Sequence, residues 1–281
     1  MVRGQRLVGT WLVGMALVVG LVSGLARAET AVAPLARLHD PVVVPGSALG
    51  ALQGAPLAEL ALLAYRGGSW AAVPFQIDEV NAAGAYVGSE DGLLDGNDEL
   101  VFMPPDAGDL APPGVWVADD LARLAPRAVI TVTDPLNPAA AGWAYLYRST
   151  TLPRSPAVYV SWDAAAQTAT AVSYTFRFAP QTHLGIADLA LNGAPADVLD
   201  RQKLRAQATL YVGSFPVGSL AIDEASILNF ITTPVTISLP IAGPVRAVGG
   251  SATQQVALYA SRADLAVALD VAEQPLPGVP G

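Results

Sequence analysis

The chain has 281 residues and a formal net charge of −9, with a single lysine and no cysteine. Nucleic-acid affinity depends largely on Lys and Arg that neutralise phosphates, so this balance argues against a nucleic-acid partner. Twenty-three prolines interrupt any long helix, and the length allows one large β domain or two small ones, with a real core.

The N-terminus has the features of an export signal. Arg3 and Arg6 precede an apolar run over residues 7–25, and the small residues around Ala28 suit a signal peptidase. We expect cleavage after Ala28, so that residues 1–28 are a signal peptide and the protein is secreted or periplasmic. The alternative is an uncleaved signal anchor, the one membrane attachment that the sequence suggests. Without cysteine, stability must come from burial, strand pairing or a bound ion.

The acidic side chains concentrate in one part of the chain. Residues 67–120 carry eleven Asp and Glu and no Lys or Arg, a local charge of −11 that leaves +2 for the rest of the chain. Oxygen ligands at alternate positions of tight loops suit a hard cation. The sequence therefore predicts one bound calcium, with candidate ligands at Asp78, Glu79, Asp91, Asp95, Asn97, Asp98 and Glu99.

A true EF-hand is rejected, because Leu100 stands where that loop needs glycine. The alternative is that "DG" and "DGND" are hairpin turns whose side chains bond to local amides. Carboxylates that lie close together repel one another by on the order of 1 kcal/mol for each pair. A bound cation would relieve this repulsion, and the prediction of calcium rests on that argument.

Period-two alternation of apolar residues dominates the rest and predicts β-strands. In residues 172–178, Val172, Tyr174, Phe176 and Phe178 fall on one face. Further strands are expected in "RAVITVTDP", "GWAYLYR", "AVYVSW", "KLRAQATLYV", "PVTISLP", "QQVALYA" and "DLAVALDV". In "KLRAQATLYV" the alternation turns Leu210 and Val212 inward. We expect an all-β, antiparallel β-sandwich over residues 29–272, one helical turn near 196–202, and a disordered Pro/Gly tail over 273–281.

Two clusters could bind a ligand. Arg201, Lys203 and Arg205 could contact an anionic sugar, since guanidinium forks suit carboxylates; the alternative is a solvated turn that pairs with the acidic segment. Trp143 and Tyr145, which share a strand face with Tyr147, could form a sugar-stacking platform; the alternative is a core stripe. A Ser-His-Asp site would need His39 or His183, the latter with Asp188, and a hydrogen-bonded turn is the plainer interpretation.

Five blocks together carry a resemblance: "VPFQIDEV", "EDGLLDGNDELVFMPPDAGD", "VTDPLNPAAAGWAYLYR", "DVLDRQKLRAQATL" and "IAGPVRAV". They resemble a group of bacterial secreted proteins and the opening motifs of rhamnogalacturonan-lyase-like and galactose-mutarotase-like supersandwich proteins. The resemblance implies a supersandwich-like fold and extracellular carbohydrate work. The chain stops soon after "GPVRAV", where such enzymes continue through further strands of the sugar cleft.

Two functions follow as expectations. The first is an exported, non-catalytic β-sandwich module that binds a glycan, a polysaccharide or a cell-envelope partner, stabilised by calcium. The second is a polysaccharide-processing enzyme of the lyase or glycoside hydrolase type, or a shortened relative of one. An enzyme should bring a cation, a Tyr and a carboxylate into one concave site, whereas a module needs only an exposed face.

Overall fold

A computed structural model describes residues 35–179, 185–192, 194, 196–199, 206–222, 236–251 and 254–267. Contacts within the chain divide it into residues 1–31 and 32–281, and all described residues belong to the second unit. The predicted signal peptide, the tail, His183, Arg201, Lys203 and Arg205 lie outside the described residues.

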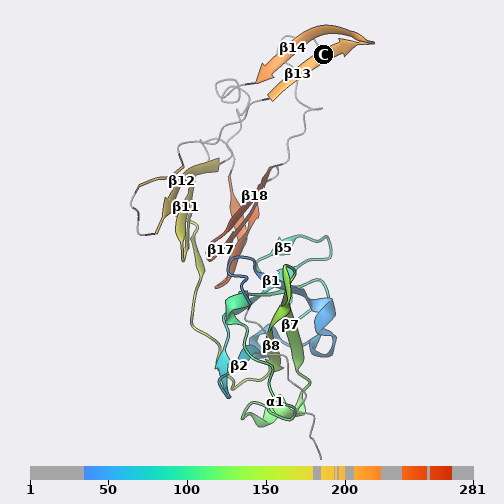
Figure 1. Cartoon of the computed structure of the whole chain (residues 1–281), viewed down its shortest axis with the longest axis vertical. Coiled ribbons are helices and arrows are strands. Elements are labelled where there is room, and N and C mark those ends of the chain that lie inside the picture. Colours follow the sequence, from blue (N-terminus) through green and yellow to red (C-terminus); the bar gives the residue numbers. More distant parts are fainter. Residues whose placement is uncertain are drawn as a thin grey trace, which may run out of the picture. The chain divides into compact units, whose positions relative to one another are not determined.

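The described chain is mostly β, as the alternation predicted, and its strands form small antiparallel sheets (Figure 1). Two four-stranded sheets occupy the first half of the described chain. The first sheet has the order β1-β6-β4-β5 and consists of β1 (Val42–Pro45), β6 (Glu99–Phe102), β4 (Phe75–Val80) and β5 (Tyr86–Val87). The second has the order β3-β2-β8-β7 and consists of β3 (Ser69–Ala72), β2 (Leu60–Arg66), β8 (Asn137–Arg148) and β7 (Ala128–Asp134).

The second half of the described chain holds three sheets. One has the order β12-β11-β10-β9, from β12 (Ile186–Leu191), β11 (Tyr174–Phe178), β10 (Thr168–Ala171) and β9 (Val160–Asp163). Another has the order β15-β16-β17-β18, from β15 (Ser238–Ala242), β16 (Arg246–Gly250), β17 (Gln254–Tyr259) and β18 (Ala263–Val267). The third is a hairpin of β13 (Ala206–Val212) and β14 (Phe215–Ile222).

Helical structure in the described residues is short. Three 3-10 helices are η1 (Gly46–Leu52), η2 (Leu57–Glu59) and η3 (Pro104–Asp106), and the α-helix is α1 (Asp120–Leu124). The helical turn expected near 196–202 is wrong where it can be checked, because Asp197 forms a β-bridge with Ala190 instead. None of the described helices is long and apolar enough to cross a membrane.

Two main cores hold together four of the five described sheets, all except the β13–β14 hairpin. The first draws buried side chains from both sheets of the first half, including Leu62 and Leu146 of the β2–β8 pair and Leu100 and Phe102 of β6. The second joins Phe176 of β11 to side chains of β15, β16 and β17. Each core therefore lies against strands of two different sheets.

Alternation predicted the burial of some strands and failed for others. In β11, Tyr174, Phe176 and Phe178 are buried as expected. Val172 is exposed, because it lies in a bend before the strand begins. In β13, Val212 is also exposed, and a register shift falls between Leu210 and Tyr211. The expectation that Leu210 and Val212 face a core is wrong.

Candidate functional site

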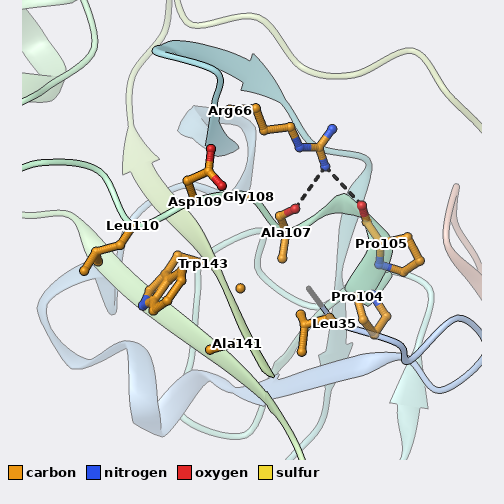
Figure 2. Close-up of a pocket in the computed structure, with 11 residues that line it drawn as sticks. Leu35, Arg66, Pro104, Pro105, Ala107, Gly108, Asp109, Leu110, Ala141 and Trp143 are labelled. Carbon is orange, nitrogen blue, oxygen red and sulfur yellow. Dashed lines mark hydrogen bonds between the residues drawn. The ribbon is translucent and has the colours of Figure 1, made fainter. Parts of the chain in front are cut away.

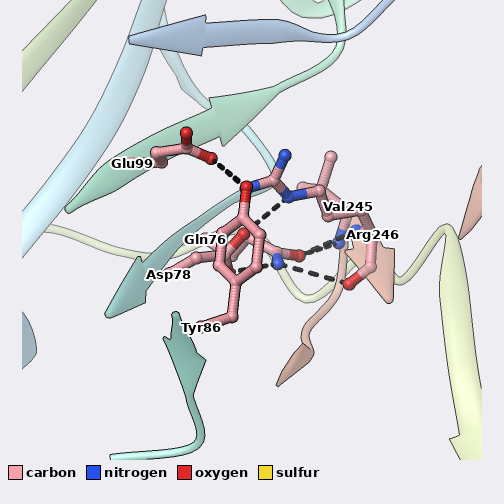
Figure 3. Close-up of polar contacts among 6 residues, drawn as sticks. All are labelled: Gln76, Asp78, Tyr86, Glu99, Val245 and Arg246. Carbon is pink, nitrogen blue, oxygen red and sulfur yellow. Dashed lines mark hydrogen bonds and ion pairs between the residues drawn. The ribbon is translucent and has the colours of Figure 1, made fainter. Parts of the chain in front are cut away.

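Two carboxylates of the acidic segment face each other on the first sheet. β4 pairs antiparallel with β6, and this register places Asp78 directly opposite Glu99. Like charges directly opposite across a ladder destabilise it. Arg246, the first residue of β16, lies against both: its Nε donates to Asp78 Oδ2 at 2.6 Å, and its guanidinium also pairs with Glu99 Oε2 (Figure 3).

Gln76 completes this contact through the backbone of β16. Its Oε1 accepts from the backbone N–H groups of Val245 and Arg246, both at 2.8 Å. Its Nε2 donates to Arg246 O at 3.2 Å and to Asp78 Oδ1 at 2.5 Å. A Cβ at Gly243 would stand 2.5 Å from Gln76 Oε1, so glycine keeps room for this side chain. Gln76 thus connects two segments about 170 residues apart.

One group of contacting side chains, which we call the Arg246 cluster, consists of Gln76, Asp78, Tyr86, Glu99 and Arg246. Burial lowers the pKa of Arg246, but Asp78 and Glu99 raise it by more, so its pKa lies above the ordinary value. The Tyr86 hydroxyl donates to Glu99 Oε2 at 3.0 Å, and burial raises the pKa of Tyr86. Arg246 is 4% exposed and Asp78 is 2% exposed. The cluster is a largely buried connection between β16 and the first sheet, in which one guanidinium bonds to two carboxylates.

The neighbouring carboxylates are satisfied in a different way. Glu79 accepts from the backbone N–H groups of Glu90 and Gly92 at 3.0 and 2.8 Å. Asp98 accepts from those of Val80 and Asp95 at 3.1 and 2.7 Å. Burial raises the pKa of Asp98, although both backbone bonds lower it. These carboxylates hold the turns of residues 88–98 in place.

These turns also lie close to η1. Gly46 N donates to Asp98 O at 2.7 Å, and a Cβ at Gly46 would stand 1.7 Å from Asp95 O. Asp91 accepts from Leu93 N, and the Asn97 side chain donates to Val80 O. The alternative interpretation, in which Asp and Asn side chains bond to local amides, describes this loop well.

The seven predicted calcium ligands are therefore divided. Asp78 and Glu99 bond to Arg246, while Glu79, Asp91 and Asp98 bond to backbone N–H groups. The Asn97 side chain donates to Val80 O, and Asp95 takes part through its backbone N–H, which donates to Asp98. Across the described parts of the chain, no group of three or more His, Cys, Asp or Glu is arranged to hold a metal ion. Calcium binding stays a prediction.

The aromatic stripe of β8 lies largely in a core. Tyr145 and Tyr147 are 1% and 0% exposed, and Trp70 of β3 meets both rings edge-on. Tyr145 OH accepts from Ala111 N at 2.7 Å. Both tyrosines therefore follow the core interpretation of the stripe. Trp143 differs, because it is only half-buried.

Trp143 lines an open hollow of about 580 Å³, which Figure 2 shows with its lining residues. Arg66, at the end of β2, and Asp109, in the loop after η3, contribute the charged side chains of the lining. The remaining lining residues are small or apolar: Leu35, Pro104, Pro105, Ala107, Gly108, Leu110, Ala141 and Gly142. An aromatic ring, a guanidinium and a carboxylate thus border one concave surface.

Close backbone contacts fix this hollow. Trp143 and Gly108 exchange two backbone hydrogen bonds of 2.9 Å, and a Cβ at Gly108 would stand 2.3 Å from Tyr65 O. Arg66 donates to the carbonyls of Pro105 and Ala107 at 3.3 and 3.4 Å. Glycine at position 108 therefore lets the loop after η3 approach β2 and β8.

Asp109 is anchored beside this surface, because its Oδ2 accepts from Gly67 N at 3.3 Å. Sequence reasoning found Trp143 but missed Arg66 and Asp109. Arg66 lies just before residues 67–120, and nothing in the sequence around the end of β2 indicated that it could bind a ligand. Asp109 was counted with the other acids and had no distinguishing motif.

The described residues give little support to the Ser-His-Asp site considered for the two histidines. His39 Nδ1 lies 2.6 Å from Ser261 Oγ, on an exposed surface. Asp188, the carboxylate considered with His183, forms an ion pair with Arg177. Neither observation builds a Ser-His-Asp site.

Comparisons with known proteins identify no relative: no family model, no curated protein and no solved structure matches this chain. The resemblance to supersandwich proteins rests on the short sequence blocks alone and stays a prediction.

Proposed function

We propose that this chain is an exported, non-catalytic module that binds a glycan or another polysaccharide of the cell envelope in the hollow beside Trp143. The observation that carries this proposal is the meeting of Trp143, Arg66 and Asp109 on one open concave surface. Binding sites are typically concave, mostly apolar surfaces with a few convergent polar groups.

Each of the three side chains suits a saccharide. The face of an indole ring offers apolar area to the C–H face of a sugar ring. A carboxylate accepts hydrogen bonds from hydroxyl groups, and Asp109 keeps its second oxygen, Oδ1, beside the one that bonds to Gly67 N. The Arg66 guanidinium has five N–H donors and suits the carboxylate of an acidic sugar.

The finer fold assignment belongs to the same proposal. We infer a β-sandwich in which two sheets cover one core, as in supersandwich-like carbohydrate proteins. The mixed composition of the first core, with side chains from β2, β8 and β6, supports this inference. Export is supported by the sequence around Ala28, and mass spectrometry of the exported protein should find Glu29 at its N-terminus.

The polysaccharide-processing enzyme is the second candidate, and Asp106 is the observation that favours it. Burial raises the pKa of Asp106, the direction needed for a general acid. Its two oxygens, however, accept from Tyr159 OH at 3.0 and 2.9 Å, and it does not line the hollow. This geometry leaves binding as the better supported function.

A glycan array tests the proposal. We expect the wild type to bind at least one polysaccharide class, and Trp143→Ala and Asp109→Asn to weaken that binding about tenfold or more. Arg148→Gln is the matched control, because Arg148 forms an exposed ion pair with Glu59 and does not line the hollow. Equal binding by all four proteins, or by none, would overturn the proposal.

An absorbance assay for unsaturated uronide products should be run on the same acidic polysaccharides. We expect no rise in absorbance for the module. A rise that Asp106→Asn abolishes would replace the binding function with a lyase.

A further inference from the structure

The hairpin of β13 and β14 has an unusual composition. Its seventeen residues from Ala206 to Ile222 include no Asp, Glu, Lys or Arg. The strands turn through Gly213 and Ser214, and Gly213 adopts a positive φ of 58°, which favours glycine. Val212 pairs with Phe215 beside the turn.

The tip of this hairpin exposes large apolar side chains. Tyr211, Val212, Phe215 and Val217 are 63, 67, 76 and 60% exposed. Single exposed apolar residues are ordinary, but a contiguous group marks an interaction site. Towards the base, polar side chains appear at alternate positions: Thr209 pairs with Ser219 and Gln207 with Ala221, while the pairs between them, Ala208 with Leu220 and Ala206 with Ile222, are apolar. The base therefore carries polar groups on one face, whereas the tip carries none of Gln, Thr or charge on either face.

Apolar residues occupy both faces of the tip. Successive strand residues point to opposite faces, so Tyr211 lies on one face and Val212 on the other. Phe215 pairs with Val212 and shares its face, while Pro216 pairs with Tyr211. A protein partner seated on one face would leave the other exposed to water. A medium that surrounds the tip would cover both.

Within the described residues, β13 and β14 pair only with each other. An isolated two-stranded hairpin is at best marginally stable in water and needs something to cover its apolar residues. Pro216 suits an apolar medium because it has no backbone N–H to leave unpaired.

We propose that the tip of the β13–β14 hairpin inserts into the interface of a lipid membrane. The segment from Leu210 to Val212 extends for about 10 Å, at roughly 3.3 Å per residue, which matches the 5–10 Å to which interfacial segments penetrate. The amphipathic Tyr211 suits that depth, and Gln207 and Thr209 stay among the headgroups.

Charge indicates which lipids the hairpin meets. In the sequence, Arg201, Lys203 and Arg205 come directly before the hairpin, although they lie outside the described residues. Basic side chains next to an inserting segment are attracted to anionic headgroups, by about 1 kcal/mol each. The membrane probe is therefore a vesicle that contains phosphatidylglycerol as well as phosphatidylcholine.

The absence of cysteine from the whole chain allows a site-specific test. Phe215→Cys in the full chain is labelled with an environment-sensitive nitrobenzoxadiazole dye and mixed with these vesicles. We expect a blue shift, about a threefold rise in emission, and quenching by lipids that carry a spin label in the upper acyl chain. Leu136→Cys, at a 95% exposed position between β7 and β8, is the matched control and should not respond.

The control separates hairpin insertion from attachment through the N-terminal apolar segment, which would bring both proteins to the vesicle but leave both dyes in water. Equal, unshifted spectra at positions 215 and 136 would overturn the proposal. A blue shift at position 215 without vesicles, rising with protein concentration, would also overturn it and assign the hairpin to contact between copies of the chain.

Discussion

Neighbouring carboxylates of β4 and β6 are stabilised by opposite means. Asp78 and Glu99 belong to the Arg246 cluster and are matched by a guanidinium from a distant strand. Glu79 and Asp98, each one residue away, instead accept hydrogen bonds from backbone N–H groups: those of Glu90 and Gly92 for Glu79, and those of Val80 and Asp95 for Asp98. Successive residues of a strand point to opposite faces, so a single acidic run meets two environments. Acidic residues that are adjacent in the sequence can therefore be stabilised by different kinds of partner.

These contacts also explain why residues 67–120 tolerate their negative charge without a Lys or Arg nearby in the sequence. Sequence reasoning found no Lys or Arg within residues 67–120 and inferred that a bound cation would relieve the repulsion. Arg246 supplies one cation from about 150 residues away, and backbone N–H dipoles supply further positive partial charge. The electrostatic reason for calcium is weaker than the sequence suggested.

Removal of Arg246 should have the largest effect. Arg246→Met leaves Asp78 opposite Glu99 without a cation, and loss of one member of a buried ion pair costs about 3–5 kcal/mol. Urea unfolding measures this loss. Arg148→Met, which breaks an exposed ion pair with Glu59, should cost about 0–1 kcal/mol. Similar losses in the two variants would contradict the role of Arg246 as a buried cation for these two carboxylates.

Neutral partners should rescue that variant. Addition of Asp78→Asn and Glu99→Gln to Arg246→Met removes the unpaired charges while keeping the shapes of the side chains. We expect the triple variant to be more stable than Arg246→Met alone. A further loss would show that packing, rather than charge, dominates the cluster.

Removal of the Asp98 carboxylate tests how much the hydrogen bonds from backbone N–H groups contribute to stability. Asp98→Ala leaves the buried N–H group of Val80 and the partly buried N–H group of Asp95 without their acceptor, which should cost about 2–3 kcal/mol in urea unfolding. Asp91→Ala, which loses one bond at an exposed turn, should cost about 0.5–1 kcal/mol. Equal losses would mean that the Asp98 bonds contribute no more than a surface turn.

Calcium addition tests whether the turns of residues 88–98 bind a cation. If the acidic turns bind calcium with the weak affinity of extracellular modules, a tenfold excess over the dissociation constant stabilises by about 1.4 kcal/mol. The sequence predicts that calcium raises the melting temperature and that Asp95→Ala with Asp98→Ala abolishes the rise. Equal melting temperatures with calcium and with chelator would leave residues 88–98 as turns held by their own amides.

The smallest expected effect concerns pH and Asp119, the N-cap of α1. Hydrogen bonds from Thr151, Ala122 N and Ser149 hold the pKa of Asp119 below its ordinary value. Because its pKa is lower in the folded state than in the unfolded state, Asp119 contributes stability at pH values above the ordinary pKa of about 3.9. That contribution is lost as the pH falls through the pKa of the folded state.

Asp119→Asn removes this titration, so its stability should fall less steeply than that of the wild type in acid. Unfolding curves between pH 5 and pH 2 measure the slopes, a range set by the ordinary pKa of about 3.9. Parallel slopes for the two proteins would exclude a contribution from Asp119.

The sequence by itself determined the local structure. Alternation with a period of two placed Tyr174, Phe176 and Phe178 on one buried face, because a strand's own geometry sets which residues share a face. The "DG" pair marked a turn for the same local reason, and its Gly92 has a positive φ of 72°, which favours glycine. These features need no knowledge of the rest of the chain.

Tertiary structure alone decided which segments meet. No local pattern connects Arg246 to Asp78, since the two are 168 positions apart and either could have faced solvent. Alternation likewise could not show that Tyr145 is covered while Val212 is exposed, because burial depends on what packs against a strand face. Arg66 and Asp109 border one hollow with Trp143 only because Gly108 lets the loop after η3 approach β2.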